Sequence, residues 1–253
     1  MSRPGGPDPS VVEAPPQSSS WVLPVVAVAL VVGMVGYLKL APLDAIEQRL
    51  LVADQITART LEHVRLVVIS TVLVIVIAVP LGVLLSRRRA RWFATPILAV
   101  ANGGQAIPSI GVLVLLAVTV GVGFKMAVVS LVVYALLPVL RNTMVGLGQV
   151  SPALIDAGRG MGMSSRQVLM QIELPIAVPI MLAGIRVALI LNVGVATLAT
   201  YTNAGGLGSF IESGIVFNRM PILLTGSVLT IALALLVDWL AGLAEQRLRP
   251  RGL

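Results

Sequence analysis

Five apolar runs in this chain are each close to the length that crosses a lipid bilayer, and they restrict its possible folds more than any other feature. A helix needs about 20 mainly apolar residues to cross the hydrocarbon core. The five runs are Trp21–Leu38, Leu66–Leu85, Phe124–Leu140, Pro179–Thr200 and Pro221–Leu240. The 253 residues are 57% hydrophobic and 11% charged, which excludes an ordinary soluble globular domain. We predict an all-α, multi-pass protein of the plasma or inner membrane.

A sixth span is predicted between Arg91 and Lys125, but it cannot be one straight helix. The intervening stretch carries no charge and is too long for a single crossing, and its middle contains Asn102-Gly103-Gly104-Gln105 and Pro108. Backbone that leaves the helix at membrane depth must be buried in protein or line a polar cavity. We therefore expect a broken or kinked third span, with Gln105, Pro108 and Ser109 in the wall of a translocation pathway.

The basic residues predict the orientation of the spans. Cytoplasmic loops of membrane proteins carry an excess of Lys and Arg. Here the arginines gather in alternate connections and in the C-terminal tail: Arg87, Arg88, Arg89 and Arg91, then Arg141, Arg159 and Arg166, then Arg247, Arg249 and Arg251. About six spans with both termini in the cytoplasm fit this pattern. Residues 39–63 then form an extracytoplasmic or interfacial segment, and residues 244–253 form a cytoplasmic tail.

The ends of the chain differ from the apolar middle. Residues 1–20 are rich in proline, glycine and serine without apolar periodicity, so we expect a disordered cytoplasmic tail. Residues 21–38 are interpreted as a retained span and not as a cleaved signal peptide, because no small-residue cleavage site follows them. The net charge of +7 is attributed to cytoplasmic loops, and we expect membrane lipid and no nucleic acid as a partner.

Several kinds of chemistry have no support in the sequence. Cysteine is absent and His63 is the only histidine, so we expect no metal site and no catalytic residues. Neither lysine follows a glycine in a phosphate-binding loop, so the chain cannot supply its own ATP site. Any ATP-Mg would be held by a separate protein, and the chain itself is not expected to be an enzyme.

The region 151–175 is too polar to span a bilayer and is predicted to fold as two short helices. Ser151 and Pro152 have the features of a helix start, with a side-chain cap followed by proline at the first helical position. Gly158, Gly160 and Gly162 are expected to end this helix, and Ser164 and Gln167 have capping-box spacing for a second one. Pro175 and Pro179 are expected to end the second helix. The simplest alternative is a solvated connecting loop.

The spacing within this region resembles the coupling loop, or EAA motif, of ABC-importer permeases. That family pattern is Glu-Ala-Ala, three residues, Gly, nine residues and Ile-x-Leu-Pro. This chain has Asp156, Ala157, Gly158, Gly162, Ile172, Leu174 and Pro175 at the matching positions. Asp156 and Gly158 depart from the family's Glu and Ala. The resemblance implies that a partner ATPase grips this loop and drives movement of the spans.

Further segments resemble permeases for osmoprotectants such as glycine betaine, choline and carnitine. They are Glu62-His63, residues 78–82, residues 105–109, residues 134–143 and Gly205-Gly206-Leu207-Gly208. The resemblance extends from about Glu62 to Leu243 and implies a five-span transmembrane domain over residues 64–243, with the first span as an addition. It also implies ABC ATPase subunits, an extracytoplasmic substrate-binding protein and a second permease copy or paralogue.

Polar residues along and after the fifth predicted span are candidates for the pathway. They are Asn192, Thr197, Asn203, Gly205 and Gly206. Small residues there also favour simple helix packing. Arg186, within the same span, is expected to reach toward the interface or to pair with an acid such as Glu173.

Two other classes of function remain as alternatives to an osmoprotectant importer. One is an ABC permease for another small solute, such as an amino acid. The other is a stand-alone secondary transporter, which should carry acidic residues in mid-span as ion relays. We find no acid at mid-span in the predicted segments, and no set of residues typical of a membrane enzyme.

Overall fold

The computed structural model describes residues 21–87 and 90–248, and these are helical along most of their length. The long helices are α1 (Val22–Leu40), α3 (Ala53–Leu85), α4 (Arg91–Ala106), α6 (Phe124–Gly148), α9 (Leu174–Val195) and α11 (Met220–Leu248). The shorter α-helices are α2 (Ala45–Leu50), α5 (Ser109–Thr119), α7 (Pro152–Gly160), α8 (Ser165–Val168) and α10 (Gly208–Val216). A π-helical turn, η1 (Leu169–Glu173), joins α8 to α9, and a 3₁₀ segment, η2 (Ala196–Thr202), follows α9.

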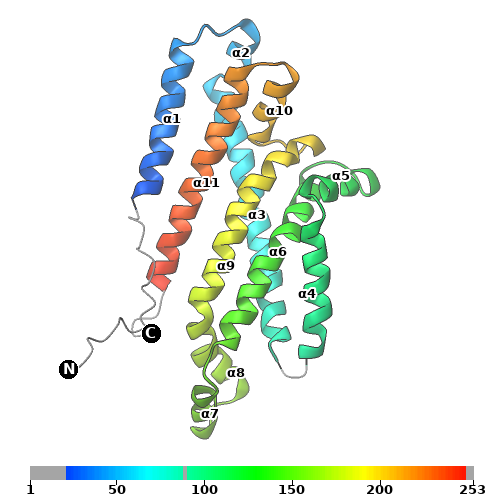
Figure 1. Ribbon diagram of the computed structural model, residues 1–253, viewed down its shortest axis with the longest axis vertical. Helices are drawn as coiled ribbons and strands as arrows, with labels where there is room; N and C mark the ends of the chain where they lie inside the picture. The colour runs from blue at the N-terminus through cyan, green and yellow to red at the C-terminus, as the bar shows by residue number, and fades with distance from the viewer. Residues whose placement is uncertain (1–20, 88–89, 249–253) are drawn as a thin grey trace, which may run out of the picture.

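The long helices lie roughly along one axis, with the connecting helices at the two ends (Figure 1). Helices α7 and α8 lie at one end, while α2 and α10 lie at the opposite end. Five helical segments are long and apolar enough to cross a membrane, and the bent pair of α4 and α5 makes a sixth crossing if it counts as one span. The prediction of an all-α membrane protein with about six spans is confirmed. The orientation of these spans remains a prediction.

The break in the third span falls where the sequence predicts it. Helix α4 ends at Ala106, Ile107 has an extended backbone, and Pro108 is the residue before α5. The two helices meet at an angle of 93°. Proline has a fixed φ and disfavours a helical conformation in the residue before it, which explains a sharp change of direction at this point.

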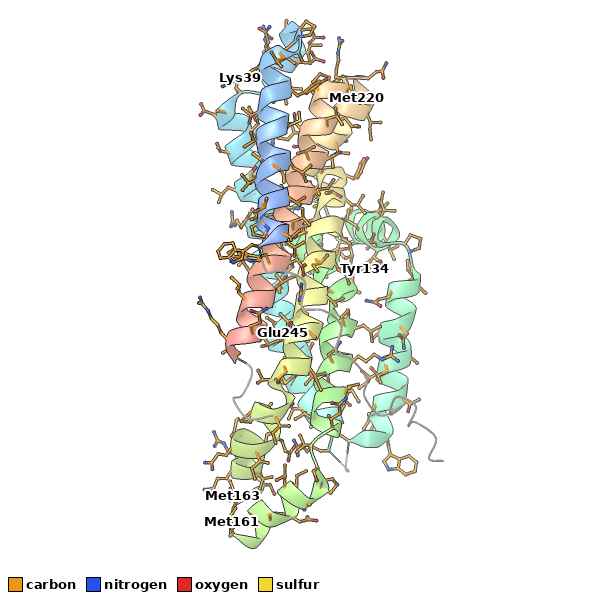
Figure 2. All side chains as sticks on the ribbon, turned by 60° about the vertical axis from the view of Figure 1, so that its left-hand side comes forward. Lys39, Tyr134, Met161, Met163, Met220 and Glu245 are labelled. Carbon is orange, nitrogen blue, oxygen red and sulfur yellow. The ribbon has the colours of Figure 1, made fainter. Side chains whose placement is uncertain are left out.

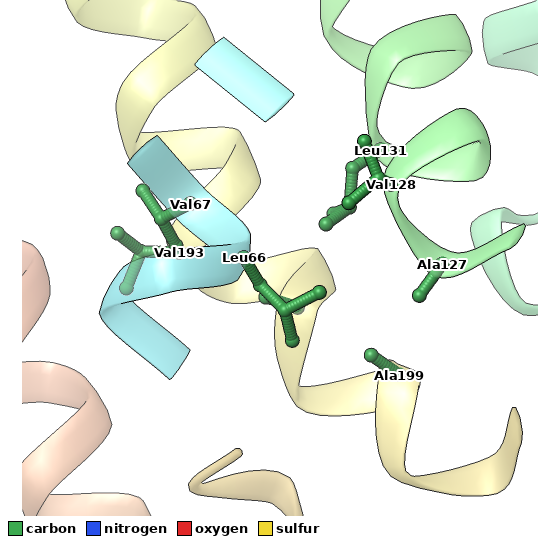
Figure 3. Close-up of a cluster of buried hydrophobic side chains, with 8 residues drawn as sticks. Leu66, Val67, Ala127, Val128, Leu131, Val193 and Ala199 are labelled. Carbon is green, nitrogen blue, oxygen red and sulfur yellow. The ribbon is translucent and has the colours of Figure 1, made fainter. Parts of the chain in front are cut away.

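Helices α3, α6 and α9 form the centre of the bundle. Their buried contacts include Leu66 and Val67 from α3, Leu131 from α6 and Val193 from α9, which lie together in Figure 3. Gly184 lets α9 approach α6 closely, since a Cβ atom at this position would lie 2.8 Å from the Pro138 carbonyl oxygen. Close approach through small residues is typical of helix pairs in membranes.

The first helix, α1, packs on the outside of this centre and contacts α11. Only Ala27 and Met34 of its residues are buried. Trp21, just before α1, lies against Trp239 of α11 with 5.6 Å between the ring centroids. The exposed apolar face of α1 suits a lipid environment.

Arg186 is paired with acids, as one of the two expectations for it required, but the acids are Asp238 and Glu245 and not Glu173. The Arg186 guanidinium donates two hydrogen bonds to the carboxylate of Asp238 on α11, and its Nη1 lies 3.6 Å from Glu245. An arginine within an apolar span is costly unless it is paired, and these two acids supply the pairing. The ion pair thereby connects α9 to α11.

Candidate functional site

The segment from α7 to η1 forms a compact projection at one end of the bundle (Figure 1), which we call the end knob (residues 151–173). Figure 2 shows Met161 and Met163 at its tip. Gly158 is its buried packing point, because a Cβ atom there would lie 2.6 Å from Ile172 Cδ1, 3.3 Å from Met163 Sδ and 3.5 Å from Val168 Cγ2. Glycine at this position allows α7 to lie directly against α8 and η1.

The corner between the two parts of the end knob is held by local hydrogen bonds. Gly162 has a φ of +84°, a conformation that glycine adopts at little cost and other residues rarely adopt. The Met163 amide donates to the Gly158 carbonyl, with 3.1 Å between nitrogen and oxygen. Ser164 and Gln167 form the predicted capping box, with each side chain accepting from the other residue's backbone amide. The corner is therefore defined by backbone geometry and is not a loose linker.

Three details of this region differ from the sequence predictions. The Ser151 side chain precedes α7 but accepts no capping hydrogen bond from a backbone amide of the helix, although Pro152 does occupy the start of the helix. Gly158 and Gly160 lie inside α7, which continues to Gly160 because its packing against Ile172 favours helix at these positions.

The third difference is that Pro175 and Pro179 do not end a helix. Helix α8 continues through η1 into α9, and both prolines lie within α9. The π-turn explains this for Pro175, because the Leu174 amide donates to the Leu169 carbonyl five residues earlier, which widens the helix just before Pro175. A proline normally clashes with the carbonyl of the residue four positions earlier, and a wider turn relieves that clash.

An ion pair between a half-exposed arginine and a buried glutamate fastens the end knob to the bundle. Arg87, just after α3, donates from Nη1 and Nη2 to the two carboxylate oxygens of Glu173, at 3.0 and 2.6 Å. The Glu173 side chain is only 6% exposed, while that of Arg87 is 38% exposed. Two parallel hydrogen bonds fix both distance and orientation, so η1 is held at a defined place beside α3.

The outer surface of α7 is open to contact. Asp156 and Ala157 are exposed, and Asp156 Oδ1 lies 4.0 Å from Arg159 Nη1. A hollow of about 410 Å³ lies between this face and the end of α3, lined by Arg87, Ile155 and Asp156 among others. Ile172 and Leu174 are half-buried, and Pro175 is exposed. The seven predicted coupling residues thus lie on one continuous segment, with Gly158 and Ile172 in direct contact.

The predicted pathway residues fall into three separate groups. The first is at the bend between α4 and α5, where Gln105 Nε2 donates to the Tyr134 carbonyl of α6 at 2.9 Å. Pro108 is exposed and Ser109 is half-buried there. The second group lies on α9 and η2. Asn192 is fully buried and donates to the Thr71 hydroxyl at 3.0 Å, while Thr197 donates to the Gly194 carbonyl.

The third group, Asn203, Gly205 and Gly206, forms a turn after η2 in which all three residues have positive φ. Glu62 of α3 accepts a hydrogen bond from the Gly206 amide at 2.9 Å. The His63 side chain connects α9 to the residue before α10. Its Nδ1 accepts a hydrogen bond from the Leu207 amide, and its Nε2 donates one to the Val193 carbonyl of α9. We call these contacts the far-end clasp, because they connect α3, α9 and the turn before α10 away from the end knob.

A family profile described as "Binding-protein-dependent transport system inner membrane component" matches residues 78–250, which is more than half of the chain. The chain belongs to this family. Curated relatives agree. The osmoprotectant import permease protein OsmW of Salmonella typhimurium is 37% identical over 83% of this chain and 100% of its own length. The osmoprotectant import permease protein OsmY of the same organism is 41% identical over 74% of this chain and 80% of its own length.

A solved structure supports the same membership for the permease. A chain of the inward-facing MetNI methionine ABC transporter is similar with a TM-score of 0.70 and 25% identity, covering 82% of this chain and 100% of that chain. The carnitine transport permease protein OpuCB of Listeria monocytogenes is 37% identical over 77% of this chain and 88% of its own length. The resemblance seen in the sequence is therefore confirmed, and the chain is a membrane permease subunit of an ABC importer.

Sequence reasoning missed the residues that attach the end knob and the far-end clasp. Arg87 is one member of a basic run that also indicates orientation, so its pairing with Glu173 was not visible. Glu62 and His63 were noticed only as part of a resemblance, and nothing local in the sequence indicates that they bind Gly206 and Leu207. Contacts over such sequence separations depend on the packing of α3 against α9.

Replacing Glu62 with alanine is expected to lower the free energy of unfolding by about 1–3 kcal/mol. The Gly206 amide would lose its carboxylate acceptor at a partly buried site, and an unpaired buried donor carries a cost of this size. Thermal unfolding of the purified permease in detergent measures the change. Glu62→Gln is the matched variant, because its amide oxygen can still accept from Gly206 and its loss should be smaller. Equal stability of the alanine variant and the unchanged permease would contradict the clasp.

Proposed function

We propose that this permease moves an osmoprotectant or related quaternary amine, such as glycine betaine, choline or carnitine, across the plasma membrane. The observation that carries this proposal is the identity of 35–41% to permeases that are named for these solutes. The relatives include choline and glycine betaine/carnitine/choline permeases as well as the osmoprotectant and carnitine permeases described above. Membership of a binding-protein-dependent family supports a substrate-binding protein that delivers the solute.

The end knob is the proposed coupling site for a partner ATPase, which would hold the ATP-Mg. Three features support this role. The knob projects from one end of the bundle, its corner is internally hydrogen-bonded, and its base is fixed to α3 by the Arg87–Glu173 pair. A rigid projection transmits a displacement, because it has no loose segment that would absorb the movement. Closure of the ATPase could then bias the spans between two arrangements.

The orientation follows from the same assignment. The basic residues Arg159 and Arg166 lie in the end knob, and Arg247 lies in the last turn of α11. The excess of arginine at cytoplasmic ends supports a cytoplasmic knob with both termini on the same side. The far-end clasp would then face the substrate-binding protein.

A second permease copy or paralogue would complete the pathway. Gln105, Pro108 and Ser109 are the better candidates for its wall, because irregular backbone in a membrane requires a protein or polar surrounding. The bend between α4 and α5 provides such backbone at half-buried and exposed positions. Asn192, Gly205 and Gly206 connect helices within this chain. Their proposed contribution is to fix the positions of the helices that form the pathway, without contacting the solute.

Uptake by reconstituted vesicles tests the proposal. The permease is assembled with its ATPase and substrate-binding protein in lipid vesicles, and ATP is supplied on the side of the membrane that carries the ATPase. Accumulation of labelled glycine betaine, choline and carnitine across the membrane is then measured. We expect uptake of at least one quaternary amine that depends on ATP. Uptake of methionine instead would favour the amino-acid alternative, which the similarity to the MetNI permease supports. Uptake by the permease alone, without the ATPase, would contradict the ABC mechanism.

A further inference from the structure

An apolar groove of about 620 Å³ runs along the outside of the permease between the last two turns of α3 and the continuous helix of α8, η1 and α9. Its walls are apolar for most of their length and include Val83 and Leu84 on one side and Met170 on the other. At the knob end the lining becomes polar, with Arg87 and Arg166. The groove adjoins the hollow beside Asp156, with which it shares Arg87, and its lining includes none of the predicted pathway residues.

The groove lies where a membrane-spanning segment meets the aqueous phase. The apolar run Leu66–Leu85 is followed directly by Ser86 and Arg87, so the hydrocarbon boundary falls at this end of α3. The lining residues of α3 extend from Val79 to Leu84, roughly 8 Å along the helix at 1.5 Å per residue, and Arg87 follows just beyond the helix end. The apolar part of the groove therefore faces acyl chains, and the arginine end faces headgroups.

The arginine end has an excess of positive charge. Arg87 is neutralised by Glu173, and its guanidinium still has N–H groups beyond the two that Glu173 accepts. Arg166 is exposed, and within residues 21–87 and 90–248 it forms no ion pair with an acid. The two arginines and the single carboxylate leave one net positive charge beside an apolar channel.

We propose that this groove binds one anionic phospholipid, with an acyl chain along α3 and the headgroup phosphate at Arg166 and Arg87. Basic pockets between membrane helices on the cytoplasmic side bind anionic headgroups, and burial of methylene groups adds affinity in proportion to their number. A free phosphate would use the arginines but leave the apolar walls empty. A zwitterionic lipid would fill the walls and bring a phosphate, but its headgroup cation would be repelled by the net positive charge of the arginine end. An anionic lipid satisfies both parts of the site.

The experiment uses the full-length permease purified in detergent and mixed with phosphatidylglycerol or phosphatidylcholine of the same acyl chains. Native mass spectrometry counts the lipids retained by each chain. We expect one phosphatidylglycerol per chain to be held in preference to phosphatidylcholine. Glycerol 3-phosphate, which has the anionic headgroup without acyl chains, is expected not to be retained.

Two variants separate the two parts of the site. Arg166→Gln is expected to lower the preference for phosphatidylglycerol over phosphatidylcholine about fivefold, the effect of one basic residue near a headgroup. Val83→Trp places an indole in the groove and is expected to remove retention of both lipids. Arg247→Gln removes an equal charge from the last turn of α11, outside the groove, and should leave the preference unchanged.

The outcomes are decisive in either direction. Equal retention of the two lipids by the unchanged permease, or retention of glycerol 3-phosphate alone, would overturn the lipid assignment. Loss of the retained lipid on assembly with the ATPase or with a second copy would show that protein covers the groove, and would overturn it as well. If Val83→Trp fails to fold, the comparison of Arg166→Gln with Arg247→Gln still decides, because both substitutions are at exposed positions.

Discussion

Replacing Gly158 with leucine is expected to abolish ATP-dependent uptake while the permease still inserts in the membrane. Any side chain at this position meets Ile172 Cδ1, which would lie 2.6 Å from the new Cβ atom. Overpacking of a close contact costs about 1–3 kcal/mol, and the two parts of the end knob would separate to avoid the clash. Uptake by vesicles and co-purification of the ATPase with the permease measure the effect.

A compensating pair of substitutions makes this prediction sharper. Gly158→Ala adds only the Cβ atom, and Ile172→Val removes the Cδ1 atom that it meets. We expect uptake to be reduced in Gly158→Ala and recovered in the double variant. Gly148→Leu is the matched control, since Gly148 is an exposed helical glycine at which a new Cβ atom would have no neighbour within 4 Å outside its own helix. Normal uptake by Gly158→Leu would contradict the role of the end knob.

The features that could be predicted from the sequence are those that depend on local pattern. Apolar runs of spanning length predict the long helices, and Pro108 predicts the break between α4 and α5. The capping box of Ser164 and Gln167 was predicted because both partners lie within one helical turn. Each of these depends on residues that are close together in the chain, so no knowledge of the tertiary packing is needed.

The features that escaped prediction depend on partners distant in the sequence. Gly158 looks like a helix terminator, and only its contact with Ile172 explains why helix continues through it. Pro175 looks like a helix end until the π-turn before it is known. From the sequence alone, Arg87 and Arg186 could each pair with several acids: Glu173, Asp238 or Glu245. The packing of α9 against α11 decides that Arg186 binds Asp238.

The positions of the family motif correspond to distinct structural roles in the end knob. Its glycine at position 162 corresponds to a backbone conformation with positive φ, and its Ile at position 172 corresponds to the packing partner of α7. Asp156, the departure from the family's Glu, is exposed at the outer face of α7. The motif thus combines residues that shape the end knob with residues that a partner could contact.

Replacing Arg87 with alanine is expected to lower the free energy of unfolding by about 3–5 kcal/mol, the largest stability effect that we predict. The Glu173 carboxylate is almost fully buried and would lose both of its hydrogen-bond donors. A buried charge without its partner is strongly destabilising, whereas replacement of the whole pair by apolar residues is often nearly neutral. Thermal unfolding in detergent, together with protease cleavage within residues 151–173, measures both global stability and detachment of the end knob.

The variants of this pair should follow a defined order. Arg87→Ala is expected to be least stable, Glu173→Gln intermediate, and the double variant Arg87→Met with Glu173→Leu close to the unchanged permease. The intermediate effect follows because Arg87 is partly exposed and can turn toward water when the carboxylate is removed. Arg159→Ala provides the comparison, since its pair with Asp156 is exposed on both sides and should contribute at most about 1 kcal/mol. If Arg87→Ala were no less stable than Arg159→Ala, the Arg87–Glu173 ion pair would not be the contact that holds η1 beside α3. The end knob would then be attached to the bundle by the apolar contacts of Leu169 and Leu174.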